Sequence, residues 1–155
     1  MTPAINIAKK ARIDFRTHSY THDKDAPSYG EEAAEKLGLS LEQVFKTLVV
    51  EDEERHLAVA VVPVSGQLDL KAVAAALKVK KVKMAAPDVV ERSSGYVLGG
   101  VSPLGQKKRL RTLIDTSARH HATIFVSAGR RGLEIELSAD DLATLTAAGF
   151  ADIGR

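Results

Sequence analysis

The sequence predicts an α+β fold, a single domain with a mixed, mostly antiparallel sheet and peripheral helices. Its 155 residues can form one hydrophobic core and are too few for two ordinary domains. Short apolar strands follow one another across short turns, and capping motifs mark the helices between them. Because we find no repeat, low-complexity segment or linker, we expect residues 1–155 to form one domain. The pattern leaves the order of the strands open.

The first half of the chain predicts helices from capping residues and strands from apolar runs. Thr2-Pro3, Ser28 with Glu31, and Asp69 are typical helix starts. In chain order we expect a helix over residues 3–12, a strand over 15–22, a charged turn over 23–27, a helix from Ser28 to Gly38, a second, shorter capping signal at Ser40 and Gln43, a hairpin of strands over 45–51 and 56–62, a helix over 70–78 and a short strand over 80–84.

The second half follows the same logic. Asp88 with Glu91 resembles a capping box, and Ser138 is a typical cap for the last helix. In chain order we expect a short helix from Asp88 to Gly95, a glycine-rich loop from Gly95 to Gly105, strands over 110–115, 122–127 and 133–137 with a basic turn over 128–131, a helix from Ser138 to Thr146, and an edge strand over 150–153.

Composition excludes several classes of protein. Hydrophobic residues make up 45% and charged residues 27%, which is typical of a globular protein. The chain has no cysteine, so disulfides, thiolate catalysis and cysteine-ligated zinc are excluded. The N-terminus lacks an apolar run of signal-peptide length, and no stretch approaches the ~20 apolar residues that span a bilayer. We therefore expect a cytoplasmic protein that does not bind membranes.

Charge is distributed unevenly along the chain. Residues 23–55 carry ten acidic and four basic side chains, whereas residues 71–131 carry thirteen basic and three acidic ones. This separation favours a surface that faces a polyanion, although solvated lysines and arginines would give the same count. The most basic segments are residues 106–111 and residues 127–133, and either could bind phosphates.

Lys46 lies in an otherwise apolar strand. Alternation places Phe45, Thr47 and Val49 on one face of this strand and Lys46 on the other. Both faces are largely apolar, which is typical of a central strand covered on both sides. A lysine there is costly unless its ammonium reaches water, a partner or a ligand. Lys46 is therefore either a side chain that extends to solvent or part of a binding site.

The segment Gly95–Gly105 is the second candidate site. Its glycine pair, Gly99-Gly100, would allow backbone N–H groups to approach an anion or a carbonyl oxygen closely. The segment is neither a P-loop nor a Gly-x-Ser-x-Gly motif, so Ser102 is better interpreted as a hydrogen-bonding residue than as a nucleophile. An ordinary loop remains the alternative interpretation.

The histidines do not predict a metal site. On a strand, His18 and His22 would lie about 13 Å apart, too far to share one ion. The adjacent His120 and His121 would point to opposite faces of a strand. We therefore expect neither a metal nor another cofactor.

Three segments together resemble the YbaK/EbsC family, namely Phe45-Lys46-Thr47-Leu48-Val49, Gly99-Gly100-Val101-Ser102-Pro103, and Ser127 to Glu136. The similarity extends over essentially the whole chain. The family comprises free-standing editing deacylases related to the editing insertion of bacterial prolyl-tRNA synthetase. Membership implies a barrel-like mixed sheet with peripheral helices, and hydrolysis of the ester that joins a misattached amino acid to the 3′ end of tRNA.

The resemblance also implies residue roles. Lys46 matches the essential lysine, whose ammonium would hold either the phosphate of the terminal adenosine or the aminoacyl group. The backbone amides of Gly99, Gly100 and Val101 would face the scissile carbonyl. Tyr29 and Glu134 stand where some relatives have phenylalanine and aspartate, which bears on pocket size and amino-acid preference. The expected substrate-binding positions are Tyr20, Tyr29, Thr47, Ser102, Pro103, Ser127 and Glu134, and the expected tRNA-binding positions are Lys107, Lys108, Arg109, Arg130 and Arg131.

The expected function is deacylation of mischarged Cys-tRNA(Pro) and, by extension, of Cys-tRNA(Cys). The chain has no cysteine nucleophile. The resemblance implies substrate-assisted chemistry, in which the substrate's thiol or a tRNA 2′-hydroxyl takes part. Two alternatives stay open: editing of Ala-, Ser- or Thr-charged tRNA, and a non-catalytic module that binds tRNA or a synthetase. The expected partners are tRNA and prolyl-tRNA synthetase, with the protein itself a monomer.

Overall fold

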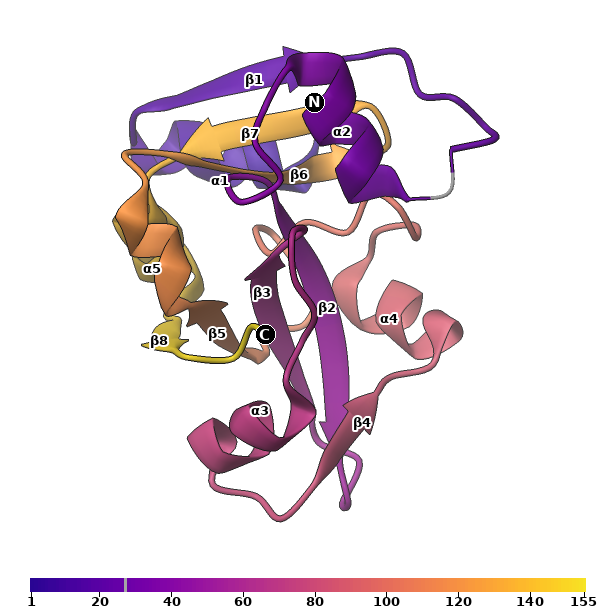
Figure 1. Cartoon of the computed structure of the whole chain (residues 1–155), viewed down its shortest axis with the longest axis vertical. Coiled ribbons are helices and arrows are strands. Elements are labelled where there is room, and N and C mark those ends of the chain that lie inside the picture. The colour runs from indigo at the N-terminus through magenta and orange to yellow at the C-terminus, as the bar shows by residue number, and fades with distance from the viewer. Residues whose placement is uncertain (27) are drawn as a thin grey trace.

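The computed structural model describes residues 1–26 and 28–155 (Figure 1). Pro27, at the end of the expected charged turn over 23–27, lies outside the described residues. The helices are α1 (Pro3–Ala11), α2 (Tyr29–Leu37), α3 (Leu70–Leu77), α4 (Pro87–Ser94) and α5 (Ala139–Thr146), with a 3₁₀ helix η1 (Thr116–His120). The strands are β1 (Phe15–Ser19), β2 (Phe45–Asp52), β3 (Leu57–Pro63), β4 (Val82–Met84), β5 (Arg111–Asp115), β6 (Ile124–Arg130), β7 (Leu133–Leu137) and β8 (Gly149–Ala151).

The strands form two sheets, and helices lie between the strands along the chain. The α+β prediction is therefore confirmed. A three-stranded sheet has the order β1-β7-β6, and a five-stranded sheet has the order β4-β2-β3-β5-β8. Most pairs are antiparallel, but β5 lies parallel to both β3 and β8. A parallel bridge between Val44 and Phe125 connects the two sheets just before β2 begins. The sheets do not close into the barrel that the family resemblance implied.

Strand β2 is covered on both faces, as the alternation predicted. Phe45 and Val49 pack in a core cluster with α1, β6, β7 and α5. Leu48 and Val50 contribute to a second cluster with the apolar residues of α3. In Figure 1 the long β2–β3 hairpin accordingly runs through the middle of the molecule, with the three-stranded sheet at one end and α3 near the other.

Capping chemistry explains most helix bounds. The side chains of Thr2, Ser28, Asp69 and Ser138 each accept a hydrogen bond from a backbone N–H in the first turn of the helix that they begin. Gly38 ends α2 with φ of 69°, a left-handed conformation that glycine adopts without steric cost.

Several local expectations were wrong. Strand β1 ends at Ser19 instead of continuing to residue 22. Ser40 and Gln43 form a turn rather than a helix start, because β2 begins two residues later. Ala86 precedes α4 in place of Asp88, since Pro87 occupies the first helical position. Strand β6 continues to Arg130 through the expected turn over 128–131, with a register shift between Ser127 and Arg130.

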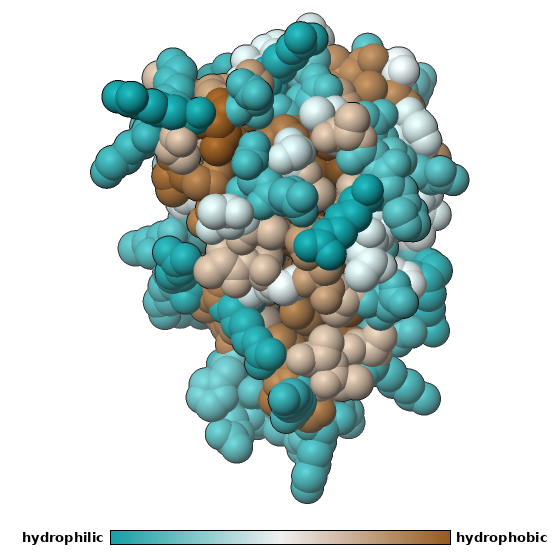
Figure 2. Space-filling model, turned by 90° about the vertical axis from the view of Figure 1, so that its left-hand side faces the viewer, coloured by the Kyte–Doolittle hydropathy of each residue, from teal (hydrophilic) through white to brown (hydrophobic). Residues whose placement is uncertain are grey.

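Polar and apolar side chains are mixed on one side of the molecule (Figure 2). Among residues 1–26 and 28–155, no helix is long and apolar enough to cross a bilayer. Figure 2 shows the side on which α5, β5 and β8 lie, where hydrophilic side chains interrupt the apolar areas. On β8, the Phe150 ring lies beneath the guanidinium of Arg119, 3.8 Å from its centroid.

The carboxylate of Asp115 ties the end of β5 to the C-terminal residues. One oxygen accepts hydrogen bonds from the N–H groups of Ile153 (3.0 Å) and Gly154 (2.9 Å), and the other accepts from Ser117 N–H (3.3 Å). Although burial opposes the charge, these hydrogen bonds and one from the Ser117 hydroxyl lower the pKa of Asp115.

We expect Asp115→Ala to lower the free energy of unfolding by about 2 kcal/mol at neutral pH, because buried N–H groups lose their acceptor. A carboxyl group whose pKa is lowered by folding stabilises the fold at pH values above its unfolded-state pKa. That stabilisation is lost as the pH falls through the folded-state pKa. The difference from wild type should therefore shrink in acid. Urea denaturation at about pH 7 and about pH 3 measures this difference.

Asp14→Ala is the control, since Asp14 is exposed and has no hydrogen-bond partner among the described residues. Equal stability of Asp115→Ala and wild type at neutral pH would contradict the assignment.

A candidate active-site pocket at the open edge of β2

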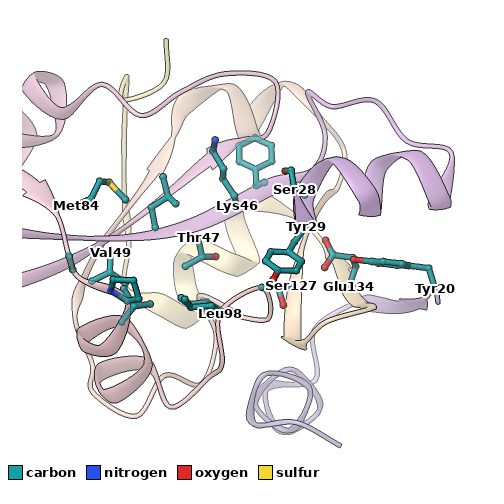
Figure 3. A pocket seen from close by; sticks show the side chains of 18 residues that line it. Tyr20, Ser28, Tyr29, Lys46, Thr47, Val49, Met84, Leu98, Ser127 and Glu134 are labelled. Carbon is teal, nitrogen blue, oxygen red and sulfur yellow. The ribbon is translucent and has the colours of Figure 1, made fainter. Parts of the chain in front are cut away.

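A pocket of about 480 Å³ lies where β2, α2, α4 and the β6–β7 hairpin meet (Figure 3). Its wall is largely apolar, with contributions from Val49, Met84, Val90 and Leu98. A small set of polar side chains points into or borders this space, as in many small-molecule sites. These polar side chains are Tyr20, Ser28, Tyr29, Lys46, Thr47, Ser127 and Glu134.

One wall of the pocket is an unpaired stretch of strand edge. Strand β4 pairs with β2 only from Val50 to Asp52, and the next contact on that side is the hydrogen bond from Ala85 N–H to Val49 O (2.9 Å). Alternate residues of a strand direct their N–H and C=O groups to the same edge. The backbone groups of Thr47 therefore face the same edge as Val49 O, where no strand among the described residues pairs with them. The pocket thus has a backbone donor and acceptor in its wall.

The Thr47 side chain adds a second polar group at this place. Its hydroxyl oxygen is buried and has no hydrogen-bond partner among the described residues. Figure 3 shows it among the pocket-lining side chains. A buried hydroxyl without a partner costs free energy, which a bound ligand would recover.

Glu134 is the buried acid of the pocket. It lies on β7 opposite Ser127 of β6, is 6% exposed, and its carboxyl group points toward the same space as Tyr20 and Tyr29 (Figure 3). Burial raises the pKa of Glu134 to about 8, because no cation or hydrogen-bond donor among the described residues stabilises the carboxylate. Burial, followed by the negative charges of Glu134 and Glu32, raises the pKa of Tyr20 to about 12. A group that titrates near neutral pH in a pocket is a candidate for function.

A second buried glutamate, Glu32, holds the pocket wall in place. Its Oε2 accepts hydrogen bonds from Asp23 N–H (2.7 Å) and the Lys36 ammonium (3.1 Å), and its Oε1 lies 2.7 Å from His22 Nδ1. Although burial opposes its charge, these contacts lower the pKa of Glu32 to about 2. They fix the segment after β1 onto α2, where Tyr29 packs 5.5 Å from the His22 ring.

Lys46 lies on the face of β2 opposite to that of Thr47, and it also borders the pocket. Its ammonium donates to Gly66 O at 3.2 Å, and Figure 3 shows it pointing away from the Thr47 hydroxyl. Lys46 and Gly99 come from the two candidate sites that the sequence indicated, and both line this pocket. The ammonium lies at the edge of this space, held by a backbone oxygen instead of a carboxylate.

The glycine loop packs more tightly than the sequence suggested. A Cβ on Gly99 would lie 2.8 Å from the Tyr29 ring, and one on Gly100 would lie 2.7 Å from Arg130 Cα. The N–H of Gly100 donates to Val97 O (3.0 Å) and so is already used. Gly99 and Val101 line the pocket, whereas Gly100, Ser102 and Pro103 do not. Ser102 is fully buried, and its hydroxyl accepts from Leu104 N–H (3.2 Å).

The two basic segments occupy different places. Arg131 lies at the pocket, because its Nε donates to Leu98 O (2.9 Å) and its guanidinium lies over the Tyr29 ring. Arg130 is exposed beside Gly100. Lys107, Lys108 and Arg109 are exposed where the chain returns to the end of α4, and they do not line the pocket.

Sequence reasoning missed the apolar part of the site. Leu98 and Met84 line the pocket and are 36% and 44% exposed. Leu98 directly precedes the glycine pair, which was the one available signal, whereas nothing in the sequence placed Met84 there. Ser28 was interpreted only as a helix cap, and it also borders the pocket. Among the described residues, no group of three His, Asp or Glu side chains could hold a metal.

Comparison with known proteins identifies the type of domain. Residues 23–145 match the aminoacyl-tRNA editing domain family. The chain belongs to this family. EbsC of Enterococcus faecalis (strain ATCC 700802 / V583), named as a candidate Cys-tRNA(Pro)/Cys-tRNA(Cys) deacylase, is 36% identical over 98% of this chain and 92% of EbsC. YwhH of Bacillus subtilis (strain 168), an uncharacterised protein, is 28% identical over 86% of this chain and 87% of YwhH.

Solved structures support the same fold for this editing domain. The structure of a candidate trans-editing enzyme for prolyl-tRNA synthetase has a TM-score of 0.84 at 21% identity, over 99% of this chain and 97% of that one. A hypothetical protein of known structure has a TM-score of 0.88 at 24% identity, over 99% of both chains. The family match and the 36% identity to EbsC confirm the predicted relationship to the YbaK/EbsC family.

Loop packing in this editing domain can be tested with an added methyl group. In Gly100→Ala the Cβ would meet the backbone of Arg130, which cannot rotate away, so the loop must shift. We expect a loss of about 1–3 kcal/mol in unfolding free energy, measured by chemical denaturation. Gly149→Ala is the control, because its nearest neighbour would be a Leu113 methyl at an ordinary 3.9 Å. If both variants are as stable as wild type, the close approach of Gly100 to Arg130 is wrong.

Glu134→Gln should change how stability depends on pH. Burial raises the pKa of Glu134 from the ordinary 4.5 to about 8, so wild type loses stability as the pH rises through that interval. The glutamine variant lacks this loss and should be clearly the more stable protein at about pH 9. Glu136→Gln provides the opposite sign, since hydrogen bonds from Thr123 and, despite some burial, His18 lower the pKa of Glu136. Parallel pH profiles for wild type and Glu134→Gln in urea denaturation would refute a raised pKa.

Proposed function

We propose that residues 1–155 form one editing domain that hydrolyses the ester between a misattached amino acid and the 3′ end of tRNA. The proposed substrate is Cys-tRNA(Pro), and by extension Cys-tRNA(Cys). The observation that carries this proposal is the pocket at the open edge of β2, where a buried carboxyl group and an unpartnered hydroxyl face an apolar space of about 480 Å³. Membership of the aminoacyl-tRNA editing domain family and the 36% identity to EbsC support it.

In this proposal the aminoacyl group enters the pocket. The α-ammonium of an aminoacyl ester is positive, and Glu134 is the buried group that would accept it. A cation at this position favours the carboxylate and so lowers the pKa of Glu134 on binding. The backbone N–H and hydroxyl of Thr47 would then donate to the ester carbonyl, where negative charge develops during attack.

The chemistry is proposed to be substrate-assisted. Neither Ser127 nor Thr47 is hydrogen-bonded to a basic side chain among the described residues, so neither is set up as a nucleophile. The thiol of a cysteinyl substrate, once deprotonated, would attack the carbonyl carbon, the bond from that carbon to the ribose oxygen would break, and the ribose oxygen would take up a proton. Water would then open the resulting thiolactone to free cysteine. The protein contributes positioning and carbonyl polarisation.

Lys46 is proposed to bind the phosphate of the terminal adenosine at the 3′ end of the tRNA. Its ammonium lies at the edge of the pocket and is held only by Gly66 O among the described residues, so it can exchange that neutral acceptor for an anionic one. Lys107, Lys108, Arg109 and Arg130 would extend this contact along the tRNA backbone. We also propose that the protein acts as a monomer and that prolyl-tRNA synthetase is a partner.

Two other functions compete with this proposal. Editing of Ala-, Ser- or Thr-charged tRNA would use the same pocket with smaller or more polar side chains. A module that only binds tRNA would show salt-dependent affinity without ester release. A panel of Cys-, Ala-, Ser-, Thr- and Pro-charged tRNA(Pro), with Cys-tRNA(Cys), distinguishes them by the rate at which each ester is hydrolysed.

Lys46→Ala should lower the rate of Cys-tRNA(Pro) deacylation by about 100-fold or more while the protein stays folded. Ser102→Ala should lose little activity, because Ser102 is buried away from the pocket. Lys71→Ala, which removes an exposed lysine of α3, is the matched control. Circular dichroism and thermal unfolding confirm the fold of each variant. Normal deacylation by Lys46→Ala would eliminate the proposed role of this lysine.

A further inference from the structure

Large apolar side chains are exposed at the mouth of the pocket. Tyr29 and Leu98 line the pocket and are 38% and 36% exposed, and the adjacent Val97 is 57% exposed. Tyr29 and Leu98 both border the pocket in Figure 3. Apolar surface in water is unfavourable, and a patch of it beside a pocket marks a binding surface.

Hydrogen bonds hold the backbone on both sides of Leu98. The N–H of Leu98 donates to a Glu91 carboxylate oxygen (3.0 Å), and its carbonyl oxygen accepts from Arg131 Nε (2.9 Å). The turn that contains them is closed by the hydrogen bond from Gly100 N–H to Val97 O (3.0 Å). Because the backbone is fixed on both sides of Leu98, the apolar side chains stay exposed instead of folding inward.

Arg131 adds a planar positive charge to the same surface. Its guanidinium carbon lies 4.8 Å from the centroid of the Tyr29 ring. Arg92 and Arg119 each contact an aspartate. Among the described residues, Arg131 has no carboxylate partner, and only its Nε donates to an acceptor. We call Tyr29, Val97, Leu98 and Arg131 the rim surface. It combines apolar contact, a flat cation and an uncompensated charge.

We propose that the rim surface binds the 3′-terminal nucleoside of the tRNA. The base packs on Val97 and Leu98, and the guanidinium plane of Arg131 stacks against it. This inference rests on the proposed function, since an acyl group held in the pocket is joined directly to the terminal ribose. That nucleoside must therefore lie at the pocket mouth, where the rim surface is. An anionic ligand with a flat base suits this surface better than a neutral apolar peptide does.

The binding test uses uncharged tRNA whose terminal adenine is replaced by the fluorescent base 2-aminopurine. We expect wild-type protein to change its fluorescence on titration, because the base leaves water and stacks. Val97→Ser should weaken binding about five-fold and reduce the fluorescence change. Ile7→Ser, which alters a side chain of α1 that is 37% exposed and outside the pocket lining, should behave as wild type. Thermal unfolding confirms that both variants are folded.

Arg131 supplies an independent test. Arg131→Ala should weaken binding and reduce the salt dependence by about one ion. Arg131→Lys should restore the salt dependence but not the fluorescence change, because lysine keeps the charge and lacks the plane. A lysine variant that restores both would show that Arg131 acts only as a charge, and would overturn the stacking role.

The outcomes separate this inference from the proposed function. Deacylation of charged tRNA together with wild-type behaviour of Val97→Ser in the 2-aminopurine titration overturns the inference alone. A fluorescence change that depends on Val97 in a protein that deacylates no member of the tRNA panel overturns the proposed function alone. If sedimentation shows a dimer that Val97→Ser dissociates and that excludes tRNA, the rim surface is an interface between copies of this chain, and the inference is wrong.

Discussion

The incomplete pairing of β2 is the constraint on which the site depends. This strand is covered by core clusters on both faces and paired with β3 from Phe45 to Glu51. On its other edge it is bridged to β6 before Phe45 and paired with β4 only from Val50. Between these contacts the backbone of Thr47 faces the pocket. A strand edge costs free energy when its polar groups are buried without partners, so the surrounding core must hold this gap open.

The two buried glutamates have opposite pKa shifts, because only one of them has hydrogen-bond donors and a cation around it. Glu32 is surrounded by His22, Lys36 and the N–H of Asp23, and its pKa is lowered to about 2. Glu134 has no such donors among the described residues, and burial raises its pKa to about 8. The first carboxylate fixes α2 to the segment after β1 and is structural. The second has no partner for its charge, so a bound cation would stabilise its carboxylate. Its unfavourable burial lowers the stability of the folded protein without ligand.

Close packing requires glycine at positions 99 and 100, independently of any chemical role of the loop. The backbone of Gly100 approaches Arg130 and that of Gly99 approaches Tyr29, so a Cβ at either position would collide. This packing brings the β6–β7 hairpin, α2 and the segment after α4 together at the pocket mouth. The same contacts place Arg131 over Tyr29 and hold Leu98 by both backbone groups. One close contact therefore shapes both the pocket wall and the rim surface.

The sequence by itself determined the α+β class, most helix bounds and the two faces of β2, because capping and alternation act between residues close in the chain. It also pointed to Lys46, Thr47, Gly99 and Glu134, all of which border one pocket. Only the tertiary structure decided the order of the strands, the parallel position of β5, and the direction of the Lys46 ammonium toward Gly66. It alone showed that Ser102 and Pro103 lie outside the pocket lining and that Met84 and Leu98 lie within it. These features depend on contacts between segments far apart in the chain, and local patterns carry no record of which distant segment fills a given space.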